Sequence, residues 1–239
     1  MSNKSRFLLD SPLAEPGEYR LNRLESHHAV NVLRHRAGDV VVVFDGTGAY
    51  ADAVIEDANK NGVRVSVAEI FTEERLPLHL TIATAMPKGK RWQVLVEKCT
   101  ELGVDRIIPL LSERSVVKGE GDVHKWRRWA VEAAKQSRRA QIPEVIEPLR
   151  LDETLVTAKS EAALLFIADP QGETPQTYRS VLKDVSRAMV IIGPEGGLSE
   201  RELDLCRKFG AKTVCLSPFT LRIETAAATV CALVREVFL

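Results

Sequence analysis

The pattern of hydrophobic and polar positions changes character near residue 73. Before that point, short apolar or alternating runs predict strands, while Ser26–His35 has the pattern of a helix. The turn Asn59-Lys60-Asn61-Gly62 suits a hairpin, because Asn-Gly accepts the positive φ angles that such turns need. Residues 1–72 therefore predict a small β-rich domain with a closed or nearly closed sheet. The expected strands are 6–10, 40–45, 51–57 and 63–71.

After a polar linker at Thr72–Pro77, strands and helices alternate. Continuous apolar runs are typical of strands covered on both faces, and alternating strands and helices favour a mainly parallel α/β sheet. Ligands of such sheets bind at the carboxyl ends of the strands. Residues 73–239 are the second predicted domain. Its expected strands are 80–86, 106–111, 162–168, 188–193 and 213–216, and its expected helices are 91–102, 123–140, 199–209 and 225–238.

The composition places the chain among soluble globular proteins. Hydrophobic residues make up 45% and charged residues 28%, so there is enough apolar material for a core and disorder of the whole chain is excluded. The longest apolar run, 162–168, is too short to span a membrane, and the first twelve residues lack the apolar block of a secretory signal. We therefore expect a cytoplasmic protein.

Cysteine and histidine spacing gives little support to a metal site. The four cysteines have no CxxC spacing, so we expect them reduced and mostly buried. No Cys or Asp completes a ligand set with His27 and His28, and no Ser-His-Asp arrangement is recognisable. We predict no metal.

The charge distribution is uneven although the formal net charge is zero. Residues 73–150 carry a net charge of +4, and the segments on either side carry −2 each. The positive charge peaks in the predicted long helix, 123–140. One interpretation is a solvated helix face, and the other is a surface that faces phosphates. The basic residues there are Lys125, Arg127, Arg128, Lys135, Arg138 and Arg139.

The first loop with candidate chemistry is Gly193-Pro194-Glu195-Gly196-Gly197-Leu198, directly after a buried strand. Ser199 and Glu202 then have the spacing of a capping box that opens a helix. A tight strand-to-helix turn would explain part of this pattern, but three glycines in five residues also allow a ligand to approach the backbone. The loop lacks the GK[ST] ending of a P-loop and is not a Rossmann GxGxxG. A nucleoside-type ligand without a phosphate chain fits better than ATP or NAD.

The second loop, residues 216–224, follows the next strand and leads into the last helix. Arg222 and Glu224 lie just before Thr225-Ala226-Ala227-Ala228-Thr229, whose alanines would let another element pack closely. A surface ion pair and ordinary helix packing are the simple alternatives. Because the two loops should lie on adjacent strand ends, we expect them to form one pocket.

Many short stretches, in this order and spacing, resemble one family along nearly the whole chain. The chain is similar to the RsmE-type small-subunit (16S) ribosomal RNA uridine-N3 methyltransferases of the SPOUT superfamily. The matching stretches are Arg6-Phe7, His27-His28, Val32-Leu33-Arg34, Gly38-Asp39, Pro87-Lys88-Gly89, Glu97–Val104, Ile107–Leu110, Ser112–Ser115, Glu132–Ala134, Gln136-Ser137, Ile192–Gly197, Leu221-Arg222 and Glu224–Ala226.

This resemblance implies a PUA-like β-barrel that helps to bind RNA in residues 1–72, and a SPOUT domain with a deep trefoil knot in residues 73–239. It also implies S-adenosyl-L-methionine in the knotted loops, and a homodimer packed partly through the last helix. The expected activity is methyl transfer to N3 of one uridine in 16S rRNA, either free or in the assembled small subunit. A noncatalytic RNA-binding factor of ribosome assembly with the same fold is the alternative.

The resemblance and the loops together indicate three sets of functional residues. The chain departs from the family pattern in the second loop, where Ser217, Phe219 and Ile223 replace a glycine, an arginine and a threonine. The expected catalytic residues are Arg222, to stabilise charge on the uracil oxygens, and Glu224, as a general base or to orient Arg222. The expected cofactor-binding residues are Ile192, Gly193, Pro194, Glu195, Gly196, Gly197, Leu216, Ser217, Leu221, Thr225 and Ala226, and the expected RNA-binding residues are Arg6, Arg34, Lys88, Arg127, Arg128 and Arg138.

Overall fold

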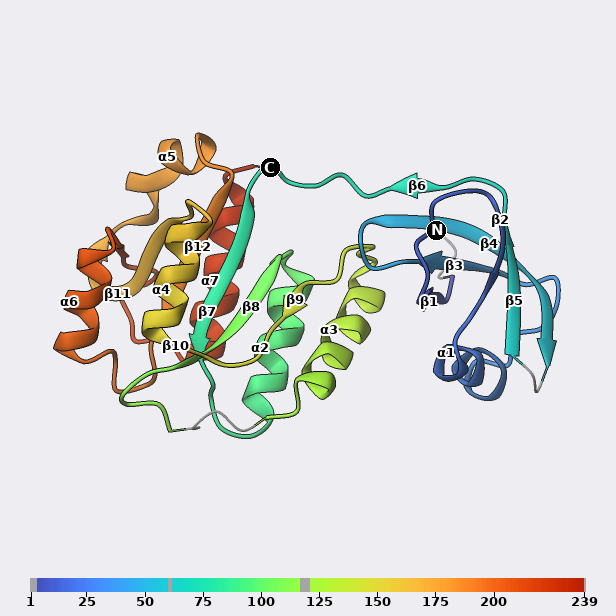
Figure 1. Ribbon diagram of the computed structural model, residues 1–239, viewed down its shortest axis with the longest axis horizontal. Coiled ribbons are helices and arrows are strands. Elements are labelled where there is room, and N and C mark those ends of the chain that lie inside the picture. The colour runs from blue at the N-terminus through green and yellow to red at the C-terminus, as the bar shows by residue number, and fades with distance from the viewer. Residues whose placement is uncertain (1–3, 60–61, 117–120, 239) are drawn as a thin grey trace. The chain divides into compact units, whose positions relative to one another are not determined.

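The computed structural model describes residues 4–59, 62–116 and 121–238 (Figure 1). The chain divides into two compact units. The first contains Met1–Arg75 together with Ala134–Ile142, and the second contains Leu76–Ala133 together with Pro143–Leu239. The tip of the hairpin predicted at residues 59–62 lies partly outside the described residues, but Asn59 pairs with Gly62 as a hairpin requires.

The first unit is built on a six-stranded sheet in the order β1-β3-β4-β5-β2, with β6 paired to β4. Only β1 and β3 pair in parallel; the other described pairs are antiparallel. Along β4, Ala51, Ala53 and Ile55 point into the core while the residues between them are exposed, as period-two alternation requires. Its elements are β1 (Arg6–Leu8), β2 (Gly17–Arg20), α1 (Arg23–His27), the π-helical turn η1 (His28–Val32), β3 (Val40–Phe44), β4 (Ala49–Asn59), β5 (Gly62–Val67) and β6 (Phe71–Thr72).

The helix predicted at Ser26–His35 begins earlier and changes type. Asn22 caps α1, because its side chain accepts a hydrogen bond from the Glu25 amide at 2.9 Å. The following turn is π-helical, with the Leu33 amide bonded to the His28 carbonyl. It ends where Arg34 takes a positive φ of 61°. The prediction missed Asn22 as the N-cap and placed the start of the helix at Ser26.

A distant segment, Ala134–Ile142, completes the first unit. One carboxylate oxygen of Glu73 accepts hydrogen bonds from the amides of Ala140 and Gln141, at 2.7 and 2.8 Å. The ammonium of Lys135 makes an ion pair with Glu25, and both side chains are about nine-tenths buried. Lys135 therefore does not belong to the solvated or phosphate-facing surface that the charge pattern suggested. The sequence did not predict this packing, because the residues that make it lie far apart in the chain.

The second unit contains a seven-stranded sheet whose described pairings are all parallel. The order is β10-β8-β7-β12-β11-β13, with β9 paired to β8. This confirms the predicted mainly parallel α/β sheet. The strands are β7 (His79–Ala85), β8 (Arg106–Leu111), β9 (Glu144–Val145), β10 (Leu149–Arg150), β11 (Leu164–Glu173), β12 (Arg187–Ile192) and β13 (Lys212–Val214).

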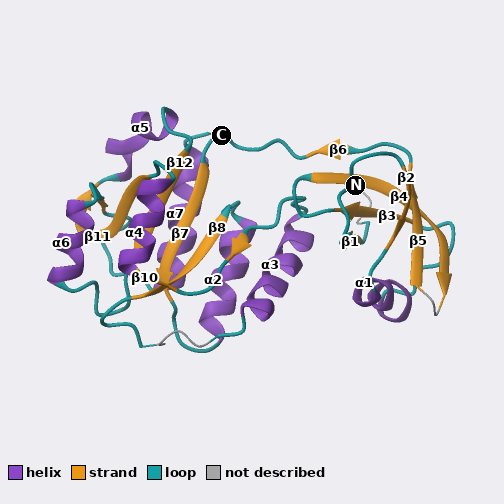
Figure 2. Cartoon of the chain, in the orientation of Figure 1, coloured by secondary structure: helices purple, strands orange, loops and turns teal. Residues whose placement is uncertain are grey.

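Helices cover both faces of this sheet (Figure 2). Along β12, Met189 and Ile191 join a core cluster with residues of α4 and α6, whereas Val190, on the opposite face, lies near Val230 and Val234 of α7. Burial on both faces explains why the strand is a continuous apolar run. The helices are α2 (Lys90–Glu101), α3 (Val123–Ser137), α4 (Leu151–Ser160), η2 (Pro175–Tyr178, 3-10), α5 (Arg179–Lys183), α6 (Glu200–Lys208) and α7 (Ile223–Glu236).

Three further differences from the predictions concern order and boundaries. The helix predicted to reach residue 140 ends at Ser137, because Arg138 has a φ of 62°. The last helix begins at Ile223 rather than Thr225, with Arg222 as its N-cap residue. Strands β12 and β13, predicted as neighbours, are separated by β11. Gly172 allows β11 and β13 to approach, since a Cβ there would lie 2.5 Å from the Val214 nitrogen.

Candidate functional site

A cavity of about 380 Å³ opens at the carboxyl edge of the parallel sheet. Residues 167–170 of β11, the loops that follow β12 and β13, and the first turn of α7 form its walls. This volume and position are typical of a small-molecule site in an α/β protein. The lining residues are Ile167, Ala168, Asp169, Pro170, Ile192, Gly193, Pro194, Glu195, Gly197, Leu198, Leu203, Leu216, Ser217, Phe219, Thr220, Leu221, Arg222, Ile223 and Ala226.

The glycine-rich loop turns tightly at the end of β12. The Gly197 amide donates to the Pro194 carbonyl at 2.8 Å, and Gly197 has a φ of 69° that disfavours other residues. Gly193 is closely packed, because a Cβ there would lie 3.2 Å from both the Leu198 nitrogen and its Cγ. The predicted capping box is confirmed: Glu202 donates its amide to Ser199 Oγ, and its carboxylate accepts from the Ser199 amide. The backbone of this loop is therefore held in one conformation.

The second loop is tied to the end of β11. The Cys215 amide donates to the Glu173 carbonyl at 2.8 Å, and the Phe219 amide donates to Ser217 Oγ at 3.1 Å. Phe219, which stands where the resembling family has an arginine, is 78% exposed at the wall of the cavity. The loop continues directly into α7, so the start of that helix contributes Ile223 and Ala226 to the cavity.

The structure brings nine of the eleven predicted cofactor residues to this one cavity. Gly196 and Thr225 are the two that do not line it; both are exposed. A Cβ on Gly196 would meet only the Arg114 side chain, at 3.7 Å, on the other side of the loop. Of the three glycines in the loop, Gly193 and Gly197 therefore line the cavity and Gly196 does not.

Sequence reasoning missed the contribution of β11 to the cavity. Ala168, Asp169 and Pro170 line the cavity because β11 lies between β12 and β13 in the sheet. The signal was present: Asp169-Pro170 follows the strand predicted at 162–168, and ligands collect at the carboxyl ends of parallel strands. In the structure β11 continues through these two residues to Glu173. Asp169 Oδ1 accepts the Gln171 amide at 2.7 Å, which leaves its second oxygen for a ligand.

The two predicted catalytic residues have different surroundings. Arg222 is exposed on the wall of the cavity. Glu224 lies one residue inside α7, does not line the cavity, and has a buried Oε2 with no hydrogen-bond partner among the described residues. Within the described parts of the chain these two side chains form no ion pair. The geometry therefore gives no support to Glu224 as the group that orients Arg222.

The six predicted RNA-binding residues are divided between the two units. In the second unit, Lys88 and Arg128 are exposed, while Arg127 donates from Nε to the Val145 carbonyl at 3.0 Å. In the first unit, Arg34 and Arg138 are exposed. These five residues are therefore accessible to solvent or to a ligand, except for the Nε of Arg127, which is bonded to Val145.

Arg6 differs from the other five. Its guanidinium lies over the Phe44 ring, 5.2 Å from the centroid, and Nη2 donates to the Arg139 carbonyl. Burial lowers the pKa of this arginine from its ordinary value, and the charges of Glu73 and Tyr50 act in the opposite direction. Arg6 therefore holds parts of the first unit together, and its contact with RNA stays a prediction.

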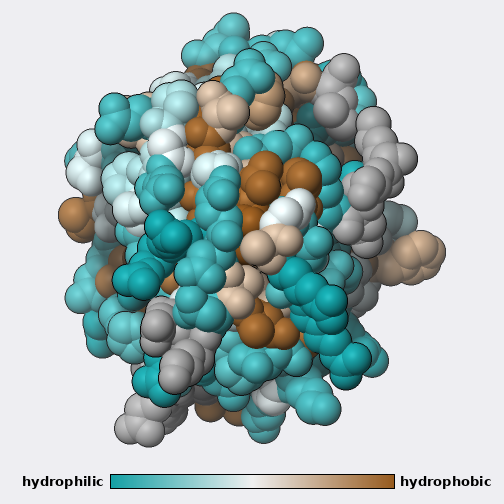
Figure 3. All heavy atoms as spheres, turned by 90° about the vertical axis from the view of Figure 1, so that its right-hand side faces the viewer, coloured by the Kyte–Doolittle hydropathy of each residue, from teal (hydrophilic) through white to brown (hydrophobic). Residues whose placement is uncertain are grey.

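The first unit also exposes large apolar side chains. Leu24, Val32 and Leu33 project from α1, η1 and the residue after them, close in sequence to Arg23 and Arg34. Figure 3 shows apolar groups bordered by hydrophilic ones on the face that it draws.

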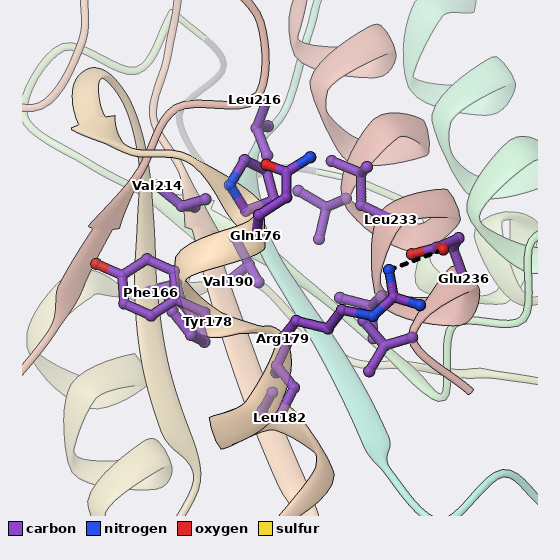
Figure 4. Close-up of a pocket in the computed structure, with 15 residues that line it drawn as sticks. Phe166, Gln176, Tyr178, Arg179, Leu182, Val190, Val214, Leu216, Leu233 and Glu236 are labelled. Carbon is purple, nitrogen blue, oxygen red and sulfur yellow. Dashed lines mark ion pairs between the residues drawn. The ribbon is translucent and has the colours of Figure 1, made fainter. Parts of the chain in front are cut away.

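A second hollow lies between α7 and the segment of η2 and α5 (Figure 4). Its volume is about 70 Å³, which is too small for a nucleoside. An ion pair of 3.0 Å joins Arg179 to Glu236 beside it, and the Tyr178 ring packs edge-on against Phe166. These contacts attach α5 to the core, so we assign this hollow to packing rather than to the reaction.

The cysteines are free thiols, as predicted, and three are buried. Burial and the neighbouring Glu202 charge raise the pKa of Cys206 to about 11. A hydrogen bond with Cys231 and burial raise the pKa of Cys99 well above its ordinary value. These thiols are therefore poor nucleophiles at neutral pH. Among the described residues, no group of three or more metal-ligating side chains occurs, and no helix is long and apolar enough to cross a bilayer.

Comparison with known proteins agrees with this architecture. Residues 74–235 match the RNA methyltransferase domain family, and residues 21–68 match the RNA methyltransferase PUA domain family. The two matches define the class: an RNA methyltransferase with a PUA domain and a SPOUT-type parallel sheet. The predicted fold class is thereby confirmed, while the trefoil knot stays a prediction.

Individual relatives narrow the class. The chain is 32% identical to ribosomal RNA small subunit methyltransferase E of Bacillus subtilis over 92% of this chain and 90% of that protein. It is 32% identical to the protein of the same name from Mycobacterium tuberculosis over 85% of this chain and 80% of that one. The crystal structure of the Neisseria gonorrhoeae protein of that name, bound to S-adenosyl methionine, superposes with a TM-score of 0.85 at 28% identity and covers 98% of both chains. The chain belongs to the ribosomal RNA small subunit methyltransferase E family.

Proposed function

We propose that this protein transfers a methyl group from S-adenosyl-L-methionine to N3 of one uridine in 16S rRNA. The observation that carries the proposal is the cavity at the carboxyl edge of the sheet. It gathers the glycine-rich loop, the second loop and Arg222 at one place. The relative from N. gonorrhoeae, which shares this fold, was solved with S-adenosyl methionine.

The lining of the cavity fits this cofactor. Backbone groups of the loops after β12 and β13 can bind the polar edge of an adenine, and Ile192, Leu198 and Leu221 offer apolar contacts to its faces. Asp169 and Glu195 both line the cavity, and their carboxylates suit a ligand with positive charge and hydroxyl groups. When bound, the cofactor supplies a methyl group already activated by a positive sulfur.

The protein must then align the base and stabilise its negative charge. Uridine N3 carries a proton and becomes a good nucleophile only when that proton leaves. In the proposal, Arg222 donates hydrogen bonds to a uracil oxygen as negative charge develops there. Correct alignment of reacting groups can contribute about 7–11 kcal/mol. Two observations support this role: Arg222 is exposed on the wall of the cavity, and its backbone stands at the N-cap of α7.

Glu224 remains the second candidate catalytic residue. Its buried Oε2 has no hydrogen-bond partner among the described residues, and an unpaired buried acceptor is costly. A hydrogen bond from the substrate N3–H, or acceptance of that proton, would satisfy this oxygen once the side chain turns toward the cavity, which it does not line. The proposal therefore requires Glu224→Gln to lose more methyl transfer than cofactor binding.

The remaining assignments are part of the same proposal. Residues 1–72 contribute RNA binding through Arg6 and Arg34. Residues 73–239 carry the methyltransferase site, and they also bind RNA through Lys88, Arg127, Arg128 and Arg138. The protein acts in the cytoplasm as a homodimer that packs partly through α7, on free rRNA or on the assembled small subunit. The target base is unstacked to enter the site.

The decisive experiment maps methyl groups on 16S rRNA from a strain that lacks this protein. We expect one uridine without its methyl group, and restoration by purified protein with S-adenosyl-L-methionine. A methyl on N3 blocks Watson–Crick pairing, so reverse transcription stops at that base only after restoration. A protein that binds 16S rRNA but neither binds the cofactor nor restores the methyl group would be a noncatalytic assembly factor.

A further inference from the structure

The turn after β8, Ser112–Ser115, packs against the outer side of the glycine-rich loop. Arg114 Nη1 donates to the Gly196 carbonyl at 2.8 Å, and the Glu113 amide donates to Glu202 Oε1 at 2.8 Å. These bonds join residues more than 80 positions apart in the sequence. The turn is therefore hydrogen-bonded to the glycine-rich loop and to the helix that follows it.

Glu202 makes this connection rigid. Its side chain is only 6% exposed, and its two carboxylate oxygens accept from two different backbone amides. One amide belongs to Glu113 and the other to Ser199, at the start of α6. A buried carboxylate is stable only with such partners. The β8 turn and the end of the glycine-rich loop therefore move as one body.

The turn also has a fixed shape of its own. The Ser112 amide donates to Ser115 Oγ at 3.0 Å, and the two serine hydroxyls lie 2.8 Å apart. Ser115 is buried, whereas Arg114 is exposed. A guanidinium has five N–H donors, and in the described structure Arg114 uses one of them on the protein. Because Arg114 is exposed, its other donors remain available to a ligand from solvent.

The order of strands places this arginine on the opposite side of the loop from the cofactor cavity. The cavity lies at β12, β11 and β13, while β8 lies two positions from β12 in the other direction. Gly193 and Gly197 face the cavity, and Gly196 faces Arg114. One loop is thus held between the cofactor site and an exposed cation.

We propose that Arg114 is a positioning residue that couples cofactor binding to RNA binding, by holding the Gly196 carbonyl and binding an RNA phosphate with its remaining donors. The inference rests on the proposed function, because it requires the cofactor in the cavity. A phosphate held by Arg114 stabilises the loop conformation that binds the cofactor. By thermodynamic linkage, the cofactor then tightens RNA binding by the same factor.

The test measures this factor directly. S-adenosylhomocysteine affinity is measured by calorimetry, and the affinity for unmethylated 16S rRNA is measured with and without saturating S-adenosylhomocysteine. For the unaltered protein we expect the ligand to tighten RNA binding about fivefold or more. For Arg114→Ala we expect that tightening to disappear and the ligand affinity without RNA to fall about three- to tenfold. Arg114→Lys should recover part of both effects.

Arg201→Ala is the matched control. Arg201 is a neighbouring arginine, 91% exposed, whose nearest ion-pair partner, Glu113, lies 4.0 Å away. It should behave as the unaltered protein does. An equal tightening in Arg114→Ala and the unaltered protein, no tightening in either, or an equal loss in Arg201→Ala would overturn the inference. Failure of the unaltered protein to bind S-adenosylhomocysteine at all would instead reject the proposed function.

Discussion

Replacing Gly193 by alanine tests the role of the glycine-rich loop most directly. The added Cβ would lie 3.2 Å from the Leu198 nitrogen and Cγ, and 3.4 Å from the Gly197 carbonyl carbon. Favourable contacts between carbon atoms occur at about 3.5–4.0 Å. Leu198 cannot easily withdraw, because it is buried in the core cluster that includes Ile191 and Cys206. The loop backbone must therefore shift.

The expected size follows from this overlap. Overpacking of one methyl group against fixed atoms costs about 1–3 kcal/mol. If the displaced loop no longer matches the cofactor, the same energy corresponds to about a 5- to 150-fold loss in affinity for S-adenosyl-L-methionine. Calorimetry on Gly193→Ala at 25 °C measures the loss, and thermal unfolding shows whether the protein is still folded.

Gly196→Ala is the matched control within the same loop. A Cβ there has only the Arg114 Cδ within 4 Å, at 3.7 Å, so no backbone shift is required. We expect nearly unchanged cofactor affinity. Normal affinity in a folded Gly193→Ala protein, or an equal loss in Gly196→Ala, would refute the assignment of Gly193 to the cofactor wall.

Four further predictions concern catalysis, RNA binding and stability. Arg222→Ala should lower kcat for methyl transfer by about 10²–10³-fold while calorimetry still detects cofactor binding, and transfer at the original rate would exclude the proposed role. Arg128→Glu should weaken RNA binding and flatten the slope of log K against log salt by about 0.7 for the lost phosphate contact; an unchanged slope would leave Arg128 on a merely solvated face. Hydrogen bonds from Arg106 hold the pKa of Glu161 below its ordinary value of 4.5. The ionised Glu161 therefore stabilises the folded protein above about pH 4.5, and this stabilisation is lost as the pH falls through the lowered pKa. Burial lowers the pKa of His79 from 6.5, so the unfolded state binds the His79 proton more readily than the folded state does. At pH values below about 6.5 we therefore expect Tm to decrease as the pH decreases, and we expect a smaller decrease in His79→Gln.

Local patterns predicted the elements that depend on neighbouring residues. The capping box of Ser199 and Glu202 marks the start of α6, because both of its bonds lie within four residues. Most strands of the parallel sheet are visible as apolar runs, since both faces of the sheet are covered. The positions of the two functional loops at strand ends therefore follow from periodicity and residue types alone.

Other elements have no comparable local signal. Strand β2 is a short polar edge strand, and α4 has an arginine, Arg150, at its N-cap in place of the usual Ser, Thr, Asp or Asn, so both were missed. The segment at 134–142 belongs to the first unit through Glu73, about 67 residues away. Such contacts depend on the folded arrangement of distant parts, which periodicity does not report.

The sequence by itself determined the class of sheet, the position of both loops and the candidate chemistry of Arg222, because these depend on hydrophobic periodicity and on residue types. The tertiary structure alone decided the order of the strands. By placing β11 between β12 and β13, it brought Asp169 to the cavity and turned Gly196 away from it toward Arg114. The physical reason is that strand neighbours are chosen by crossover connections and helix packing, which join residues far apart in the chain.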